Sequence, residues 1–162
     1  MFEKFGEFDS YIEINMAAEG LKTEGDTQSI YVVAEENGIP KDFAEMYIAG
    51  EIDCLCDAEM AAMGKIEVEA KDIKATEIVE DWVNYIKGCI GKSEKMAAAV
   101  RRKGKSLKGC IAELLKWSFK NMYPVDKDIM KAAGVTQTRT CKLGIPGSAR
   151  VKEIIRSYYL GE

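Results

Sequence analysis

Few residues in this sequence could do chemistry, because the chain contains no histidine. It can therefore form no Ser-His-Asp triad, no Cys-His pair and no histidine-ligated zinc site. Catalysis would depend on carboxylates, lysines or cysteines alone. The five cysteines are scattered, and one residue separates Cys54 from Cys56, where a redox pair or a zinc knuckle uses two. We interpret the thiols as small, mostly buried side chains.

Two short motifs suggest ligand sites, and their spacing argues against both. Gly91-Lys92-Ser93 matches the end of a phosphate-binding loop, but Ile86 occupies the position of that loop's first glycine. Glu80 and Asp81 could serve a magnesium ion, yet neighbours in a helix point in different directions. The sequence therefore predicts no catalytic residue, no metal site and no cofactor, and it favours a binding protein over an enzyme.

Basic side chains are the strongest candidates for a binding site. Residues 101–108 place five cations in eight positions, which is typical either of a solvated surface or of a contact for phosphates or an acidic protein. The segment 144–148 is typical either of a tight turn followed by an N-cap or of a loop that presents backbone N–H groups to an anion beside Arg150. The predicted partner-binding residues are Arg101, Arg102, Lys103, Lys105, Lys108, Lys116, Lys120 and Arg150.

Charge is divided between the two halves of the chain. Residues 1–82 contain 21 Asp and Glu against 6 Lys and Arg, a net charge of −15. Residues 83–162 contain 6 against 17, a net charge of +11, so the total of −4 conceals a strong separation. Because separated charges create long-range fields, the basic half favours nucleic acid or an acidic protein and the acidic half favours a basic groove.

The apolar spacing that must position these residues is helical, and it predicts an all-α, compact bundle of eight or nine short helices. Residues 65–70 alternate polar and apolar side chains, which predicts a short strand or an extended connector. Residues 136–145 are expected to be irregular, with a second extended piece over 140–143. The expected helices cover residues 10–25, 26–38, 42–48, 51–63, 76–88, 93–103, 107–121, 129–133 and 148–159.

The length of 162 residues suits one continuous domain or two small lobes. Because charge reverses near Trp82, we predict an acidic helical lobe over residues 1–75 and a basic helical lobe over residues 76–162. No apolar run reaches the roughly 18 residues that a membrane span needs, and the N-terminus lacks the order of a signal peptide. We therefore expect a cytoplasmic protein with no membrane partner.

The segment from Trp82 to Asn121 carries a family pattern. Asp81 precedes it, Trp82-Val83 opens it, and it continues through an alanine-rich helix to Lys105-Ser106-Leu107 and Cys110-Ile111 at the start of a long helix. This stretch of about 40 residues resembles the PcfK-like family of proteins from bacterial conjugative elements and phages. That family includes anti-CRISPR proteins that inhibit Cas9. The resemblance implies a helical fold, a location in the bacterial host cytoplasm and no catalytic residues.

The resemblance and the divided charge together predict an anti-CRISPR protein. It would bind a Cas9-type effector, or its ribonucleoprotein, and inhibit it stoichiometrically by occlusion or by locking a conformation. The alternative is a nucleic-acid-binding accessory or regulatory protein of a conjugative element or phage, which would bind through the basic half. An enzyme that uses carboxylates or cysteine is a third, less favoured interpretation, and the sequence leaves the oligomeric state open.

Overall fold

The computed structural model describes residues 2–135 and 140–161, and in these residues the chain forms nine helices and one two-stranded ribbon. The predicted all-α fold is therefore confirmed. Strands β1 (Tyr123–Pro124) and β2 (Lys142–Leu143) pair in antiparallel register. The helices are α1 (Tyr11–Glu24), α2 (Thr27–Glu36), α3 (Lys41–Ala49), α4 (Ala58–Asp72), α5 (Ile78–Ile90), α6 (Glu94–Arg101), α7 (Leu107–Lys120), α8 (Lys127–Ala132) and α9 (Ser148–Leu160).

Most helices begin at the N-cap that the sequence indicates. The side chains of Ser10, Asp26, Ser93 and Ser106 each accept a hydrogen bond from a backbone N–H three residues later. Such a cap contributes about 1 kcal/mol to the stability of the protein, because it accepts from a backbone N–H that the helix leaves unpaired. The helix predicted over residues 76–88 is α5, which begins two residues later, at Ile78, with Glu77 at its N-cap.

The prediction of a strand or connector over residues 65–70 is wrong, because α4 runs unbroken through this segment to Asp72. Its buried residues include Ala62, Lys65, Ile66 and Glu69, which recur at the spacing of a helix face. Alternation misled the prediction because Lys65 and Glu69 are polar residues that point inward. The predicted helix over residues 51–63 is correspondingly displaced, since α4 begins only at Ala58.

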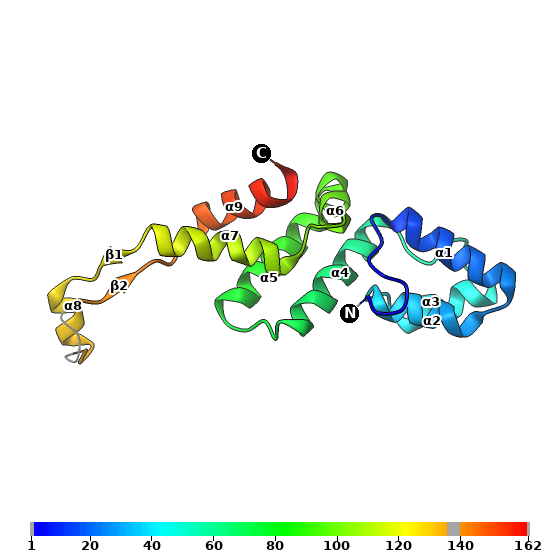
Figure 1. Ribbon diagram of the computed structural model, residues 1–162, viewed down its shortest axis with the longest axis horizontal. Coiled ribbons are helices and arrows are strands. Elements are labelled where there is room, and N and C mark those ends of the chain that lie inside the picture. Colours follow the sequence, from blue (N-terminus) through cyan, green and yellow to red (C-terminus); the bar gives the residue numbers. More distant parts are fainter. Residues whose placement is uncertain (1, 136–139, 162) are drawn as a thin grey trace.

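Helix α4 lies between two hydrophobic cores and contributes to both. One core is built from α1, α2 and α3 and ends at Ala61, and the other begins at Ala62 and includes α5, α6, α7 and α9. Figure 1 shows the first group of helices at one end of an elongated molecule and the second group in its middle. The two cores therefore meet inside α4, whereas the predicted lobe boundary at residue 75 lies just beyond its end.

Two glycines bring the turn between α2 and α3 into direct contact with α4. A Cβ at Gly64 would lie 2.1 Å from the backbone oxygen of Asn37, and a Cβ at Gly38 would lie 2.4 Å from the backbone oxygen of Gly64. Gly38 also has a φ of 66°, which side chains disfavour. Gly64 is therefore a contact point inside a helix, and not the helix end that the sequence predicts.

The Gly64→Ala variant should lower the free energy of unfolding by about 2–3 kcal/mol, because its methyl group can fit only if the backbone of the facing turn moves. Gly20→Ala is a matched control within α1, where a Cβ would meet nothing within 4 Å. It should raise stability by about 1 kcal/mol through helix propensity. Urea unfolding followed by circular dichroism measures both variants. A stabilised Gly64→Ala protein would contradict the close contact.

The segment from β1 to β2 forms an arm that projects from the helical body at the end opposite α1 to α3 (Figure 1). It carries α8 at its tip. The predicted extended piece over 140–143 is confirmed in part, because Lys142 and Leu143 form β2. Of the predicted irregular segment 136–145, residues 136–139 lie outside the described residues.

Candidate functional site: a basic groove between α7 and α9

Three of the predicted binding residues meet in a groove between α7 and α9. This groove has a volume of about 530 Å³, and both helices contribute an aromatic ring to its wall. Lysines beside aromatic rings are the side chains that bind phosphates and stack on bases in single-stranded nucleic-acid complexes. The lining residues are Lys105, Glu113, Lys116, Trp117, Lys120, Ile154, Ser157 and Tyr158.

Gly109 and Tyr158 set the distance between the two helices of the groove. A Cβ at Gly109 would lie 2.2 Å from Tyr158 Oη, so only glycine allows this approach. The backbone N–H of Ser106 donates to the same oxygen at 2.9 Å, and the Ser106 side chain accepts from the Gly109 N–H at 3.1 Å. These contacts fix the start of α7 against α9 and thereby hold Lys105 at the edge of the groove.

The three groove lysines differ in how far they are already engaged. Lys105 Nζ donates to the Tyr158 backbone oxygen at 2.5 Å and lies 4.8 Å from the centroid of the Tyr158 ring. Lys116 is 70% exposed and pairs with Glu113 at 2.6 Å. In the described part of the chain, Lys120 makes no ion pair or side-chain hydrogen bond. Because exposed pairs contribute at most about 1 kcal/mol, Lys116 and Lys120 can reorient toward an incoming anion at little cost.

Four other predicted residues lie on the surface outside the groove. Lys108 pairs with Asp72 at 2.6 Å, and this hydrogen bond lowers the pKa of the Asp72 carboxyl group. The structure thus divides the predicted basic residues among separate surfaces. The other three residues outside the groove are Arg102, which is exposed, Lys103, which lies 3.8 Å from Glu13, and Arg150, which pairs with Glu153 at 2.7 Å.

The prediction that Arg101 belongs to an exposed binding surface is wrong, because its side chain is only 1% exposed. Nη2 of Arg101 donates to Asn37 Oδ1 at 2.5 Å, and its guanidinium lies 5.6 Å from the centroid of the Phe2 ring. Burial lowers the pKa of the Arg101 guanidinium, an effect that the nearby Glu7 carboxylate opposes. Arg101 therefore joins the two lobes from inside.

Further buried charges surround this junction. Lys65 is fully buried and donates to the Glu7 carboxylate and, at 3.1 Å, to the backbone oxygen of Arg102. Glu69 accepts from the Leu107 N–H at 2.6 Å, although burial raises the pKa of the Glu69 carboxyl group overall. Sequence reasoning missed these residues because it assigns charged side chains to the surface, and only tertiary structure shows their partners.

Trp117 and Tyr158 are groove residues that sequence reasoning did not assign to a site. The sequence indicates Trp117 only as the edge of an apolar helix face, and it leaves Tyr158 open between a core and a partner contact. In the structure the Tyr158 ring packs edge-on against buried Tyr159, with centroids 4.9 Å apart. The position of Trp117 next to Lys116 and one turn before Lys120 is the one sequence feature that could have indicated its place in a binding site.

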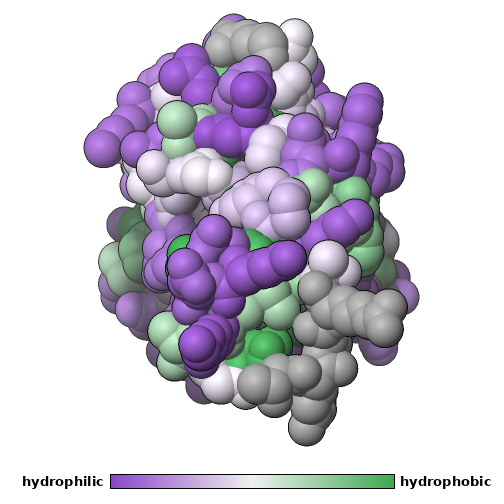
Figure 2. Space-filling view, turned by 90° about the vertical axis from the view of Figure 1, so that its left-hand side faces the viewer, coloured by the Kyte–Doolittle hydropathy of each residue, from purple (hydrophilic) through white to green (hydrophobic). Residues whose placement is uncertain are grey.

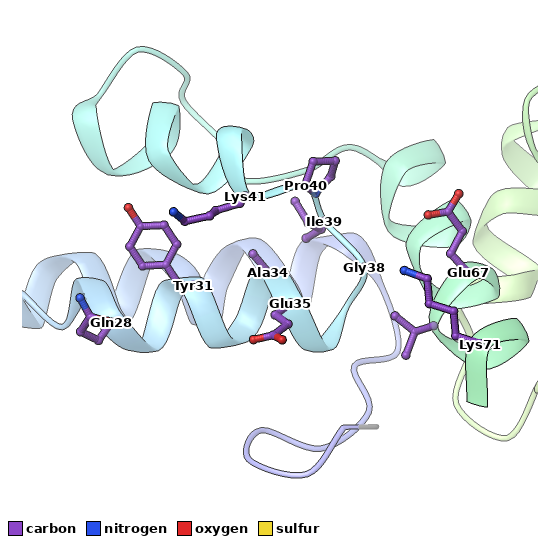
Figure 3. A pocket seen from close by; sticks show the side chains of 11 residues that line it. Gln28, Tyr31, Ala34, Glu35, Gly38, Ile39, Pro40, Lys41, Glu67 and Lys71 are labelled. Carbon is purple, nitrogen blue, oxygen red and sulfur yellow. The ribbon is translucent and has the colours of Figure 1, made fainter.

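A larger hollow, of about 800 Å³, lies between α4 and the turn that joins α2 to α3. Figure 3 shows Tyr31 and Lys41 on one side of it and Glu67 and Lys71 on the α4 side. Lys41 already pairs with Glu45 at 3.1 Å. Because charges of both signs line this hollow, it attracts neither anions nor cations strongly and is a weaker candidate than the basic groove.

The two rejected short motifs lie at helix starts. Ser93 of the Gly91-Lys92-Ser93 motif is the N-cap of α6, and Glu80 and Asp81 lie in the first turn of α5. Within residues 2–135 and 140–161, no three Cys, Asp or Glu side chains gather closely enough to hold a metal ion. The groove is therefore the surface that best joins the sequence-predicted residues into a site.

Cys56 and Cys110 should resist thiol reagents while the protein is folded. Both side chains are buried, and burial raises the pKa of each thiol to about 12, so very little reactive thiolate exists near pH 8. Cys54 is exposed and should react first. Alkylation followed by peptide mass spectrometry measures the order of modification. Equal labelling of Cys54 and Cys56 without denaturant would contradict their different burial.

Comparison with known proteins assigns no family to this chain. No family model matches it, and neither a curated protein nor a solved structure does. Among the described residues, every helix is too short or too polar to span a membrane.

Proposed function

We propose that this protein is an anti-CRISPR protein that binds a Cas9-type effector in the bacterial cytoplasm and inhibits it stoichiometrically, without catalysis. The observation that carries the proposal is the separation of opposite charges along the long axis. Residues 1–57, which include α1 to α3, contain 14 Asp and Glu against 3 Lys. Residues 107–162, which include α7 to α9, contain 5 against 10 Lys and Arg. Figure 1 shows these segments toward opposite ends of the molecule.

The acidic end is suited to a channel that normally holds nucleic acid. Cas9-type effectors bind the guide and target strands in positively charged channels, mainly through the phosphate backbone. Carboxylates on α1 to α3 would occupy such a channel and compete with phosphates. Attraction between the two fields would also speed association at low salt, because charge complementarity acts mainly on the rate of encounter.

The basic groove offers a second contact at a different place on the effector complex. Lys116 and Lys120 would pair with guide-RNA phosphates or with an acidic protein surface, while the Trp117 and Tyr158 rings would stack on an exposed base. A rigid molecule that binds the effector at two separated points restricts the conformational change of that effector. Inhibition would then combine occlusion at the acidic end with locking through the groove.

The residues that resemble the PcfK-like pattern support the proposal through their structural roles. The stretch from Trp82 to Asn121 builds α5, α6 and α7, which form most of the second core and one wall of the groove. In the part of this stretch that most resembles the family, Ser106 caps α7, and Leu107 and Cys110 are fully buried. The simplest physical explanation of the resemblance is that PcfK-like proteins share this fold and present the same groove.

The groove also favours one second candidate, an accessory protein of a conjugative element or phage that binds nucleic acid directly. Lysines beside Trp117 and Tyr158 would serve free single-stranded nucleic acid as well as bound guide RNA. The acidic end opposes this alternative, because its net charge of −11 repels a long polyanion.

Quantitative binding to an immobilised Cas9-type ribonucleoprotein tests the proposal, with naked guide RNA and duplex DNA as parallel targets. We expect a one-to-one complex with the ribonucleoprotein whose affinity falls as salt rises, and at least roughly 100-fold weaker binding to either naked nucleic acid. Binding of equal strength to naked RNA or DNA would instead favour the accessory protein. No binding to any effector of this type would overturn the proposal.

A further inference from the structure

Within the described residues, the arm between α7 and α9 is too small to be stable alone. Strands β1 and β2 have two residues each, all of them exposed, and α8 has six residues. A two-stranded ribbon and a helix of this length are marginal in water unless another surface covers them. Figure 1 shows α8 held away from the other helices, so the described body of the same chain does not supply that surface.

The arm and the adjoining end of α7 expose large apolar side chains. Phe119 is 65% exposed, Ile129 61%, and Tyr123 54%. Leu115 and Phe119 lie one turn apart on α7, and exposed Met122 follows two residues after that helix ends, so apolar side chains lead from α7 into the arm. Figure 2 views the molecule from this end and shows apolar side chains in green between hydrophilic ones in purple. Contiguous exposure of this kind marks an interaction site.

The charge around this apolar surface restricts its partner. Residues 120–146 contain five Lys and Arg against two Asp, so two arms that packed against each other would bring like charges together. Around α7, Leu115 and Phe119 are offset from Trp117 and Lys120, whereas Lys116 lies one turn before Phe119 and borders both surfaces. The occupant must therefore be apolar with an acidic border.

The opposite end of this same chain has that chemistry. Met16 is 66% exposed and Ile12 54%, and they lie one turn apart on α1. Beside this helix lies a hollow of about 500 Å³ whose charged lining residues are Glu19, Asp53 and Lys22, so acidic groups outnumber basic ones there. Residues 1–57 carry a net charge of −11. The α1 end is thus an apolar surface with an acidic border, which complements the arm.

We propose that a second copy of this chain covers both surfaces, with the arm of each copy bound to the α1 face of the other in an antiparallel dimer. In this dimer both surfaces of each copy face the partner, and the two-fold axis makes the two contacts identical and leaves neither surface uncovered. Opposite net charges at the two ends favour this antiparallel arrangement over a parallel one. The dimer forms without an effector, and because it covers the α1 face, it must dissociate before the acidic end can enter an effector channel.

Sedimentation of the purified full-length protein tests the dimer, and we expect a species of twice 18.0 kDa at micromolar concentration. The Phe119→Glu and Met16→Glu variants should each raise the dissociation constant by at least roughly 30-fold, because each removes a central apolar contact. Ile78→Glu is the control, since Ile78 is 40% exposed but belongs to neither surface. Circular dichroism checks that the variants keep their helices.

Mixing the two disabled variants gives the sharpest result. The Phe119→Glu copy keeps its α1 face, and the Met16→Glu copy keeps its arm, so an equimolar mixture should regain one contact and form a heterodimer. A dimer joined only through two arms would survive Met16→Glu and would not be restored by mixing. Either that pattern or a wild-type protein that stays monomeric throughout the micromolar range would overturn the proposal.

Discussion

Replacement of Arg101 by alanine should lower the free energy of unfolding by about 3–5 kcal/mol, the range observed when one member of a buried charged network is removed. The substitution deletes the guanidinium that donates to Asn37 Oδ1 at 2.5 Å and leaves that buried amide oxygen without its donor. It also removes one of the two positive charges, with Lys65, that favour the ionised Glu69 carboxylate, and it leaves a cavity between the two cores.

Arg102→Ala is the matched control for this prediction. Arg102 follows Arg101 directly, but its side chain is exposed, and only its backbone oxygen contributes to the junction by accepting from Lys65. The control should therefore change stability by less than about 0.5 kcal/mol. Chemical unfolding of the two variants and the wild type measures the difference. Similar stabilities for Arg101→Ala and Arg102→Ala would contradict the buried junction.

Charge reversal in the groove should weaken effector binding by at least roughly 100-fold, if about 1 kcal/mol or more is lost at each of three contacts. The variant changes Lys105, Lys116 and Lys120 to Glu. Repulsion then replaces attraction where an anion would bind, so the dependence of affinity on salt should also become shallower. Binding to the immobilised ribonucleoprotein at several salt concentrations measures both quantities.

A second triple variant separates the groove from net charge. Lys71, Lys74 and Lys92 are exposed and lie outside the groove, so their change to Glu alters the net charge by the same amount. We expect this control to change affinity by less than roughly 10-fold, because charges away from a contact act mainly on the rate of encounter. Equal losses for both variants would show that the overall field, and not the groove, governs binding.

Local signals were sufficient to predict most of the fold. Ser10, Ser93 and Ser106 mark helix starts because capping depends on the few residues around them. Gly25 and Gly50 mark helix ends because they adopt a left-handed conformation that other residues avoid. Where the boundary chemistry is local, the sequence therefore predicts the helix within one or two residues.

The errors occur where a distant segment determines the structure. The sequence pattern predicts a helix end at Gly64, but this residue lies within α4, where its lack of a side chain allows Gly38 of a distant turn to pack against it. From sequence alone Lys65 and Arg101 would be placed on the surface. In the structure both are buried, and Lys65 donates to Glu7 while Arg101 donates to Asn37. No pattern within one helix reveals such partners, since each lies more than thirty positions away in the sequence.

The candidate site was predictable in part for the same reason. The sequence predicts Lys105, Lys116 and Lys120 as binding residues because cations cluster along its basic half. Their aromatic partner Tyr158 comes from α9, and only the contact with Gly109 brings that helix alongside α7. A sequence thus predicts which residue types could bind an anion, whereas the packing of α7 against α9 decides which of them share a groove.

The most direct test of the proposed function is a titration of this protein into a DNA-cleavage reaction catalysed by a Cas9-type ribonucleoprotein. With the ribonucleoprotein held well above the dissociation constant, cleavage should fall linearly and stop at a fixed molar ratio, independent of preincubation time, while guide RNA and target DNA remain intact. Undiminished cleavage at a large excess of this protein would contradict effector inhibition. Complete inhibition by far less than one equivalent that deepens with time would contradict a binding mechanism and indicate catalysis.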